Sequence, residues 1–290
     1  MLIAQITDMH VSTASSGMEA LIDMSGHLER AVDHLNALRP RPDVLFATGD
    51  LVEHGRRDEY EHLREILGRL AMPVYVIPGN HDDRANLTAA FADHRYLPRD
   101  GGFLQYAIDD WPLRLVALDT LVPGETGGAL DAGRLAWLDA RLAGAPDRPT
   151  VVFMHHPPFV TGMPAMDGMG MRPGDAAALA AIVRRHPQVE RIACGHVHRP
   201  IVRRFAGTVA CTCPGTAHQV ALDLAPERRL ATVMEPPACL LHFWLDTADG
   251  VVTHVSPIGT PPVFTVFDGE KWLKDAVPPR GFNPRRSAAG

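Results

Sequence analysis

The sequence predicts an α/β fold, in which helices cover a β-sheet, and two patterns indicate it. Short apolar runs rich in Val, Ile and Leu alternate with longer amphipathic segments, as strands alternate with helices in such folds. Pro or Gly stands just outside several of the amphipathic segments, where helices stop. The 290 residues are 46% hydrophobic and 21% charged, so a core can form, and the length fits two domains or one large α/β domain with an appendage.

The expected elements follow in order along the chain. In the first two hundred residues we expect strands at 2–6, 44–47, 74–77, 113–118, 151–154 and 191–194. The expected helices are 26–38, 57–70, 84–93, 131–142 and 175–185. From Ile201 the pattern changes to strand-like runs, which predict antiparallel hairpins at 209–212, 218–222, 230–234, 240–245 and 251–255.

Two segments have little periodicity. Residues 161–174 hold four methionines among Gly and Pro, and we expect a flexible loop rather than a core element. Residues 260–290 are rich in Pro, Gly and Arg, so a peripheral or partly disordered tail is expected.

Hydropathy and charge exclude several classes of protein. No stretch approaches the roughly 18 apolar residues of a membrane span, and the N-terminus lacks the basic region of a signal peptide. We therefore expect a cytoplasmic protein without a membrane partner. The formal net charge of −6, without a Lys/Arg block, argues against binding duplex nucleic acid.

Cysteine and lysine usage restricts the chemistry. The four cysteines have neither zinc-ribbon nor redox spacing and are expected to be buried thiols in strands. Their positions are Cys194, Cys211, Cys213 and Cys239. The only lysines are Lys271 and Lys274, which excludes a Walker A lysine, so phosphate chemistry here must use metal ions or arginine.

Oxygen and imidazole donors follow five of the expected strands. In chain order they are Asp8 and His10, Asp50, Asn80 with His81 and Asp82, His155, and His196 with His198. Because ligands bind at the ends of the strands in an open α/β sheet, we expect these loops to converge. Residues i and i+2 of an extended segment face the same way, so each i, i+2 pair can present two ligands to one point. Gly49, Gly79 and Gly195 precede ligand positions and permit close backbone approach.

The number and type of donors suggest a metal centre. Seven candidate ligands are too many for one tetrahedral zinc and suit two divalent ions if Asp50 bridges them. The seven are Asp8, His10, Asp50, Asn80, His155, His196 and His198. The lack of thiolate ligands favours Fe, Mn, Zn or Co. His156, next to two prolines, is interpreted as a shaping residue rather than a ligand.

These residues resemble the calcineurin-like binuclear metallophosphoesterases, whose motifs D-x-H, G-D, G-N-H-[DE], H and G-H-x-H occur here in order. The resemblance implies a four-layer α/β/β/α sandwich with a C-terminal β-hairpin extension. It implies one metal ion held by Asp8, His10, Asp50 and His198, and another held by Asp50, Asn80, His155 and His196. The likeness is greatest to the bacterial glycerophosphodiesterase and class III cyclic-nucleotide phosphodiesterase branch, through GDLVEHGRRDEY, IPGNHDD, MHHPPF, CGHVH and PGTAHQV.

The resemblance also implies a function and three segments. We expect a core at 1–200, a β-rich segment at 201–259 that completes the second sheet and forms an oligomerisation surface or cap, and the tail at 260–290. The expected reaction is hydrolysis of a small, glycerophosphodiester-like diester by a metal-bridging hydroxide. His81 would assist the leaving group, Asp82 would orient His81, and Asn80, His81 and His218 would contact substrate. The alternatives are a 3′,5′-cyclic-nucleotide phosphodiesterase and a catalytically silent metal-dependent binding protein, and a homo-oligomer is expected.

Overall fold

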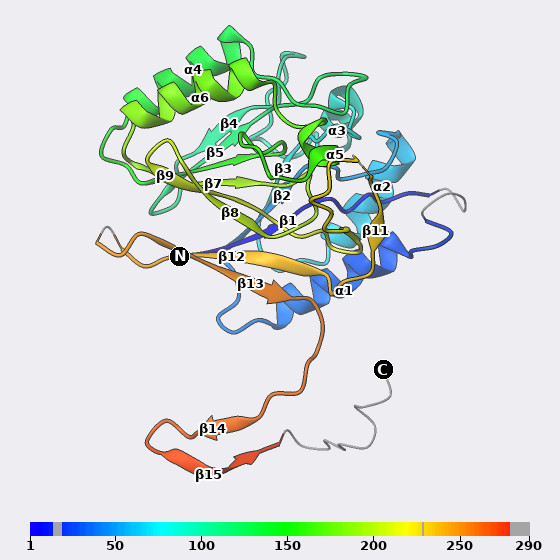
Figure 1. The fold of residues 1–290 in the computed structure, drawn as a ribbon, viewed down its shortest axis with the longest axis vertical. Helices are drawn as coiled ribbons and strands as arrows, with labels where there is room; N and C mark the ends of the chain where they lie inside the picture. Colours follow the sequence, from blue (N-terminus) through cyan, green and yellow to red (C-terminus); the bar gives the residue numbers. More distant parts are fainter. Residues whose placement is uncertain (14–18, 228, 247, 279–290) are drawn as a thin grey trace. The chain divides into compact units, whose positions relative to one another are not determined.

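Two β-sheets with helices beside them make up most of the chain, which confirms the predicted α/β class (Figure 1). The computed structural model describes all residues except 14–18, 228, 247 and 279–290. The chain forms two units, Met1–Ile258 and Gly259–Gly290. Among the described residues, no helix has the length and apolar character needed to cross a membrane.

The strands of the first unit form two principal sheets. In spatial order the five-stranded sheet is β13 (Val251–Pro257), β12 (Ala238–Trp244), β1 (Leu2–Ile6), β2 (Val44–Thr48) and β3 (Val74–Ile77). The six-stranded sheet is β4 (Tyr106–Ile108), β5 (Arg114–Leu118), β6 (Thr150–Met154), β7 (Val189–Cys194), β9 (Thr208–Thr212) and β8 (Ile201–Phe205). A separate short pair is β10 (Gln219–Val220) with β11 (Thr232–Val233). Strands β1 to β3 are parallel, as are β5, β6, β7 and β9, so each group has its carboxyl ends at one edge.

The side chains of β5 show how the layers are stacked. Leu115 and Ala117 belong to a core shared with the five-stranded sheet and with helices α1 (Met24–Ala37) and α2 (Arg57–Leu67). Val116 and Leu118 point the other way, into a core shared with helices α4 (Ala132–Ala143) and α6 (Pro173–Arg185). Period-two alternation of this kind is expected of a sheet with both faces buried. The order of layers is therefore helix, sheet, sheet, helix, and α4 and α6 lie over the six-stranded sheet in Figure 1.

Helix boundaries follow from capping residues. The helices are α1 (Met24–Ala37), α2 (Arg57–Leu67), α3 (Arg84–Ala90), α4 (Ala132–Ala143), α5 (Pro164–Asp167) and α6 (Pro173–Arg185). Helix α1 begins two residues before the predicted start, because the Asp23 carboxylate accepts a hydrogen bond from Gly26 N at 2.8 Å. Helix α2 ends three residues before the predicted end, at the Gly68 C-cap.

Some elements differ from the sequence-based expectation. Strands β4 and β8 and helix α5 were not predicted, because each is short and has no clear period. The prediction of a flexible loop at 161–174 is wrong. This segment contains α5 and the start of α6, and its Met163 and Met166 are buried against Val197 and Val220.

The strands after residue 200 join both principal sheets. β8 and β9 form an antiparallel pair at one edge of the six-stranded sheet, and β12 and β13 extend the five-stranded sheet beyond β1. Of the strands predicted after residue 200, β10 pairs antiparallel with β11 and β12 with β13, whereas β9 pairs with the unpredicted β8 and runs parallel to β7. In the second unit, β14 (Thr265–Phe267) pairs antiparallel with β15 (Trp272–Val277). This pair was not predicted, because residues 260–290 show little periodicity. The rest of the expected tail, 279–290, lies outside the described residues.

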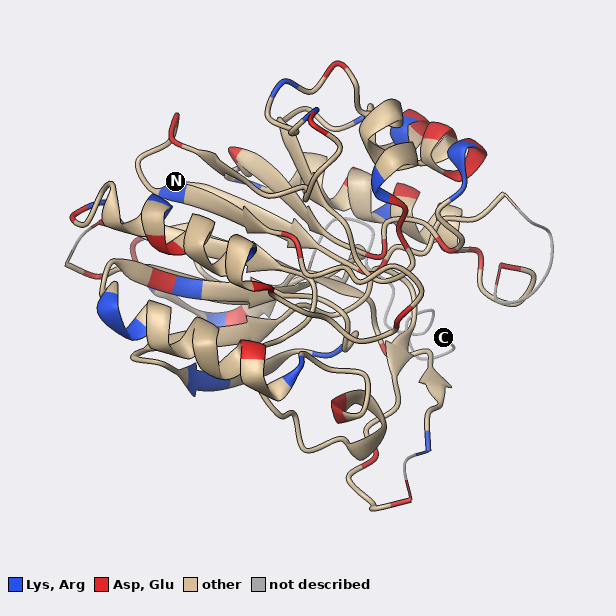
Figure 2. Cartoon of the chain, turned by 90° about the horizontal axis from the view of Figure 1, so that it is seen from above, with Lys and Arg blue, Asp and Glu red and all other residues tan. Residues whose placement is uncertain are grey.

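Charged residues of both signs are mixed over the helices. In the view of Figure 2, basic and acidic positions lie close together on the same helices. On α2, for example, Arg57 pairs with Glu61 at 2.9 Å one turn away. Exposed pairs of this kind contribute little stability, about 0.3–0.5 kcal/mol each.

Candidate metal centre

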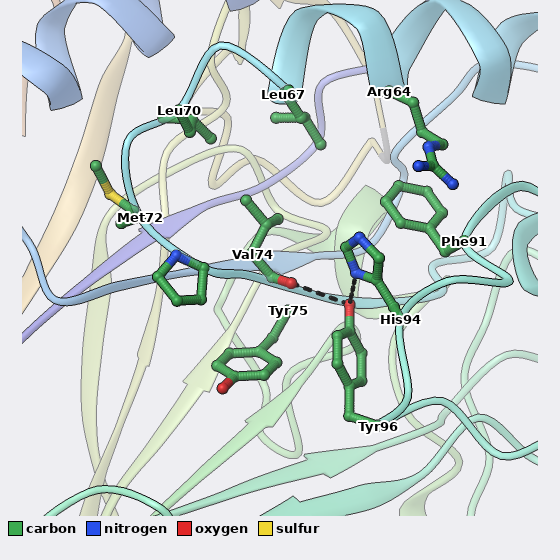
Figure 3. Close-up of a pocket in the computed structure, with 11 residues that line it drawn as sticks. Arg64, Leu67, Leu70, Met72, Val74, Tyr75, Phe91, His94 and Tyr96 are labelled. Carbon is green, nitrogen blue, oxygen red and sulfur yellow. Dashed lines mark hydrogen bonds between the residues drawn. The ribbon is translucent and has the colours of Figure 1, made fainter.

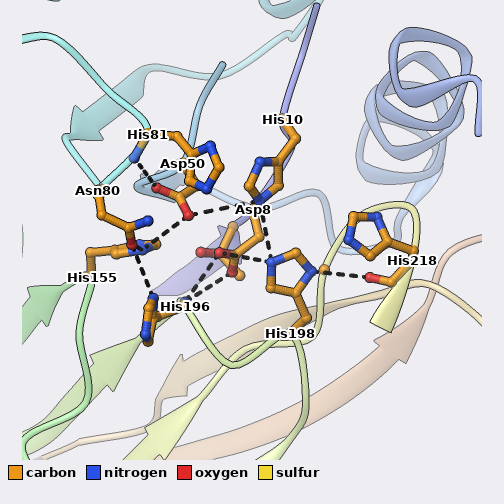
Figure 4. Close-up of polar contacts among 12 residues, drawn as sticks. Asp8, His10, Asp50, Asn80, His81, His155, His196, His198 and His218 are labelled. Carbon is orange, nitrogen blue, oxygen red and sulfur yellow. Dashed lines mark hydrogen bonds and ion pairs between the residues drawn. The ribbon is translucent and has the colours of Figure 1, made fainter. Parts of the chain in front are cut away.

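The loops that follow β1, β2, β3, β6 and β7 converge on one group of polar side chains (Figure 4). Backbone hydrogen bonds hold neighbouring loops together, from Asp8 N to Gly49 O at 3.0 Å and from Gly195 N to His155 O at 2.9 Å. The Asp8 carboxylate then accepts a hydrogen bond from His196 N at 3.0 Å, which ties the loop of one sheet to that of the other. The strand ends therefore bring together side chains that are up to 190 positions apart, as the sequence predicts.

Asp50 lies at the centre of this group. Its Oδ2 atom is 3.3 Å from His155 Nε2 on one side and 3.7 Å from His10 Nε2 on the other. Its Oδ1 atom accepts a hydrogen bond from His81 N at 2.9 Å. A carboxylate that faces imidazoles on two sides is placed as a bridging ligand would be.

The remaining donors form two sets, one on each side of Asp50. In the first, His198 Nε2 lies 3.3 Å from Asp8 Oδ1 and 3.2 Å from His10 Nε2. In the second, Asn80 Oδ1 lies 3.2 Å from His155 Nε2 and 3.1 Å from His196 Nδ1. The structure thus brings all seven predicted ligands together, and all but Asn80 are buried.

The backbone at the ligands is strained. Among the described residues, six non-glycine positions have positive φ, and five of them are predicted ligands. These five are Asp8, His10, Asp50, His196 and His198, with φ between 46° and 70°. The left-handed conformation costs a residue with a side chain about 1–2 kcal/mol. Strain that clusters in this way is typical of functional sites.

The three predicted glycines are packed too tightly for a side chain. A Cβ atom on Gly195 would lie 2.0 Å from Thr7 Oγ1, and one on Gly79 would lie 2.3 Å from Asp50 N. A Cβ atom on Gly49 would lie 2.5 Å from His155 Nδ1, and its φ is +90°. These distances agree with the sequence-based interpretation that glycine at these positions lets the backbone approach neighbouring groups closely.

The donor set fits divalent cations. Ligand atoms about 2.1 Å from an ion are separated by about 3.4 Å in a tetrahedron and about 3.0 Å in an octahedron. The separations between donor atoms here, 3.1 to 3.7 Å, match these edges. In addition, His196 Nε2 is buried and has no hydrogen-bond partner in the described chain. A buried polar atom without a partner costs free energy, so this nitrogen is expected to contact a group from outside the chain, such as a metal ion.

The electrostatics of the group are those of opposed charges in a buried site. Burial opposes ionisation of Asp8, but the His198 imidazole brings the Asp8 pKa down to about 2. Burial likewise opposes the charge on His155, yet Asp50 raises the pKa of His155 to about 9. Burial and the neighbouring His155 lower the pKa of His196 to about 4. The carboxylates thus stay ionised and attract positive charge, which protons or metal ions can supply.

Glu53 is a residue of this site that the sequence analysis did not identify. Its carboxylate lies 2.7 Å from His10 Nδ1, and its backbone carbonyl accepts a hydrogen bond from His81 Nδ1 at 2.9 Å. Burial would raise the pKa of Glu53, but the hydrogen bond from His10 lowers it. A glutamate in a loop carries no motif of its own; the indications available were its place three residues after Asp50 and inside the segment GDLVEHGRRDEY.

Asp82 has a different environment from the one expected. Its carboxylate accepts hydrogen bonds from Gly79 N at 2.8 Å, Leu51 N at 3.1 Å and Tyr60 Oη at 2.8 Å. The structure gives no hydrogen bond between this carboxylate and the His81 ring, which Glu53 orients instead. Asp82 therefore holds the loops after β2 and β3 together.

His218 and His156 flank the group on opposite sides. The His218 ring lies 4.7 Å from that of His198, and its Nδ1 atom is buried with no hydrogen-bond partner in the described chain. His156 lies within 2.8 Å of Thr120 Oγ1 through Nδ1 and 3.2 Å of Thr126 O through Nε2. Both ring nitrogens of His156 are engaged, which agrees with a shaping role.

A cavity of about 330 Å³ opens onto the centre. Its polar lining residues are His10, Asp50, Asn80, His196 and His198, together with Glu53, His81 and His218. Its apolar lining residues include Met24, Met166, Met169, Val220 and Leu230. A substrate can therefore reach the donors and place a second group against apolar side chains.

A different cavity of about 450 Å³ lies beside the edge strand β3 (Figure 3). The Tyr96 hydroxyl in this cavity donates to Val74 O and lies 3.2 Å from His94 Nδ1. It also accepts from Val76 N, so it satisfies the backbone of the sheet edge. The Tyr96 hydroxyl is thus used to support the sheet edge, and none of the candidate metal ligands lines this cavity. Five of the candidate ligands line the 330 Å³ cavity instead.

Comparisons with known proteins agree with this geometry. The model of the family "Calcineurin-like phosphoesterase" matches residues 1–200. A probable glycerophosphodiester phosphodiesterase, GpdQ, of Arcobacter nitrofigilis is 35% identical over 259 residues, which cover 89% of this chain and 94% of the relative. A probable cyclic nucleotide phosphodiesterase of Rhodopseudomonas palustris is 35% identical over 271 residues, 91% of this chain and 95% of the relative.

Among solved structures, a dimetal phosphatase from Danio rerio has a similar fold. Its TM-score is 0.58 at 15% identity, and the match covers 89% of this chain and 99% of that chain. The match to the family model covers well over half of the chain and includes every motif from Asp8 to His198. The chain therefore belongs to the calcineurin-like phosphoesterase family.

Proposed function

We propose that the chain hydrolyses small phosphodiesters with the help of two divalent metal ions, one on each side of Asp50. The observation that carries this proposal is the position of the Asp50 carboxylate between two sets of donors, 3.3 Å from His155 and 3.7 Å from His10. The first ion would be held by Asp8, His10, Asp50 and His198, and the second by Asp50, Asn80, His155 and His196. The imidazole and carboxylate ligands suit Fe, Mn, Zn or Co.

Bound ions of this kind supply a nucleophile from water at neutral pH and neutralise phosphoryl oxygens. The residues of the chain position the substrate around them. His81 lines the cavity, and its Nδ1 hydrogen bond to Glu53 O leaves Nε2 free to face a substrate. With a second proton on Nε2, His81 can give that proton to the departing alkoxide or stabilise charge on the phosphoryl group. We propose Asn80 and His218 as further substrate contacts, since both line the same cavity.

The charge of the cavity favours a diester over a monoester. No Lys or Arg is among the described residues that line it. Two divalent ions with Asp8 and Asp50 would leave only a small positive charge, and the nearby Glu53 carboxylate reduces it further. A diester carries one negative charge, whereas a monoester at neutral pH carries nearly two. The diester is therefore the better match.

Two classes of diester remain as candidates. The relatives named as a glycerophosphodiester phosphodiesterase and as a cyclic nucleotide phosphodiesterase are equally identical to this chain, at 35%. The first class is our leading proposal. The second is favoured by the apolar residues that line the cavity, because the thioethers of Met166 and Met169 can pack on a planar base.

A substrate panel tests both proposals. Metal-loaded protein is assayed with glycerophosphoethanolamine, 3′,5′-cyclic AMP and bis(p-nitrophenyl) phosphate, in the presence of Mn, Co or Zn. Hydrolysis of either natural diester, with kcat/KM at least ten-fold above that for a matched monoester, supports the proposal. Metal binding without hydrolysis of any of the three would support the silent binding protein instead.

We further propose that the protein is a homo-oligomer and that it works in the cytoplasm. We also propose that residues 1–200, 201–259 and 260–290 have separate roles as catalytic core, association surface or cap, and tail. Strand β13 is at the edge of its sheet, and its Val252 and Val255 are partly exposed, at 37% and 50%. Exposed apolar side chains on an edge strand favour association. Light scattering coupled to gel filtration gives the mass; a monomer at micromolar concentration would contradict this part.

A further inference from the structure

We propose that Glu53 is a positioning residue that fixes two imidazoles at once, the metal ligand candidate His10 and the catalytic candidate His81. This inference rests on the proposed metal centre. It assigns a task to a side chain that none of the five motifs contains. Its basis is a set of contacts that join one residue to both rings.

The first contact fixes His10. The Glu53 Oε2 atom lies 2.7 Å from His10 Nδ1, so this nitrogen carries the proton and donates it to the carboxylate. The other nitrogen, Nε2, is then left with its lone pair toward His198 Nε2 and Asp50 Oδ2, at 3.2 and 3.7 Å. A carboxylate behind a ligating histidine fixes its tautomer and makes it a stronger donor.

The second contact fixes His81. The backbone carbonyl of Glu53 accepts a hydrogen bond from His81 Nδ1 at 2.9 Å, and the carboxylate lies 3.7 Å from the same nitrogen. The His10 and His81 rings meet edge to face, with centroids 4.7 Å apart. A displacement of Glu53 would therefore disturb both rings together.

Glu53 can serve in this way because its own backbone is held in place. Its N–H donates to Val11 O at 3.1 Å, and Val11 N donates to Leu51 O at 3.2 Å. These bonds join the loop after β2 to the loop after β1. The Glu53 side chain is 29% exposed and lines the cavity, so it stands next to the substrate without filling the site.

Three substitutions separate positioning from direct binding. Glu53→Ala removes the carboxylate, and Glu53→Gln keeps an oxygen that can accept the proton of His10. Glu61→Gln, on the exposed face of α2, is the matched control. The affinity for Mn and Zn is measured by competition with a chelator, and the melting temperature of the metal-free protein reports folding.

We expect Glu53→Ala to weaken metal binding by about 10–100-fold, the usual effect of losing such a partner. Glu53→Gln should weaken it by less than about ten-fold, and Glu61→Gln should not change it. At saturating metal, Glu53→Ala keeps the backbone hydrogen bond to His81 but removes the carboxylate 3.7 Å from His81 Nδ1 and frees the adjoining His10 ring, so kcat should fall more for an alkyl ester than for a p-nitrophenyl ester.

Two results would overturn the inference. One is wild-type metal affinity in Glu53→Ala. The other is an equal loss in Glu53→Gln and Glu53→Ala, which would make the Glu53 carboxylate itself a ligand. Metal affinity is measured without substrate, so it tests the role of Glu53 independently of hydrolysis. If the wild-type protein hydrolyses no diester but Glu53→Ala still binds metal more weakly, the proposed function is wrong and the positioning role of Glu53 is supported.

Discussion

Replacing Gly79 with alanine should damage the metal centre through sterics alone. A Cβ atom at this position would lie 2.3 Å from both the backbone N and Oδ1 of Asp50, and 2.8 Å from His155 Cε1. Ordinary contacts begin at 3.4 Å, so Asp50 must retreat by about 1 Å. Overpacking of this kind costs about 1–3 kcal/mol. Metal sites tolerate shifts of only about 0.2 Å in ligand distance, so metal affinity should fall by about ten-fold or more.

The assay compares Gly79→Ala with Gly174→Ala. An added Cβ on Gly174 would meet no atom within 4 Å, so this control changes a glycine to alanine without a clash. Equilibrium dialysis followed by elemental analysis gives metal affinity, and thermal denaturation of the metal-free protein gives stability. Gly174→Ala should match wild type in metal affinity and be at least as stable, because alanine favours the helix in which this residue lies. Wild-type metal affinity and melting temperature in Gly79→Ala would refute the reasoning, because the close packing around Asp50 would then have no consequence.

Three further predictions follow from individual contacts. Asp50→Asn should lose metal at the second site and most activity, because the central carboxylate faces both donor sets; a variant with full metal content and turnover would contradict the bridging role. His81→Ala should keep its metal and slow turnover, most severely for esters with poor leaving groups, and loss of metal content would make His81 a ligand. A hydrogen bond from the Arg114 guanidinium holds the pKa of Asp109 below its usual range, so the stability it contributes is present above the usual pKa and is lost as pH falls through the lowered value. Asp109→Asn should therefore lower the melting temperature near pH 7, and this loss should shrink progressively as pH falls below the usual carboxylate pKa of about 3.9; a loss that does not change with pH would be inconsistent with this ion pair.

Much of the centre could be predicted because strand direction is encoded in the order of the chain. The donors after β1, β2 and β3 had to meet, since parallel strands have their carboxyl ends at one edge. The i, i+2 spacing predicted that His196 and His198 present ligands to one point, but the structure places His198 in the set with Asp8 and His196 in the set with Asn80, because positive φ at both residues turns the backbone between them. The joining of the two sheets, through His196 N and the Asp8 carboxylate, could be expected only from the resemblance to a family.

Other features depend on contacts that no local pattern encodes. Glu53 and Asp82 are both acidic residues in loops, and only the three-dimensional structure shows which one contacts His10 and which one contacts Tyr60. The methionines of 161–174 were expected in a flexible loop, because their burial depends on Val197 and Val220, which come much later in the chain. The positive φ values at the ligands arise from turns after the strands; Asp and His adopt positive φ more often than most residues, but their presence alone does not predict it.

The central claim is that seven side chains from five loops hold two metal ions on either side of Asp50. Anomalous diffraction from crystals grown with Mn or Zn tests this claim most directly. We expect two peaks, one among Asp8, His10, Asp50 and His198 and the other among Asp50, Asn80, His155 and His196. A single peak at full metal saturation, or peaks that Asp50 does not touch, would contradict it.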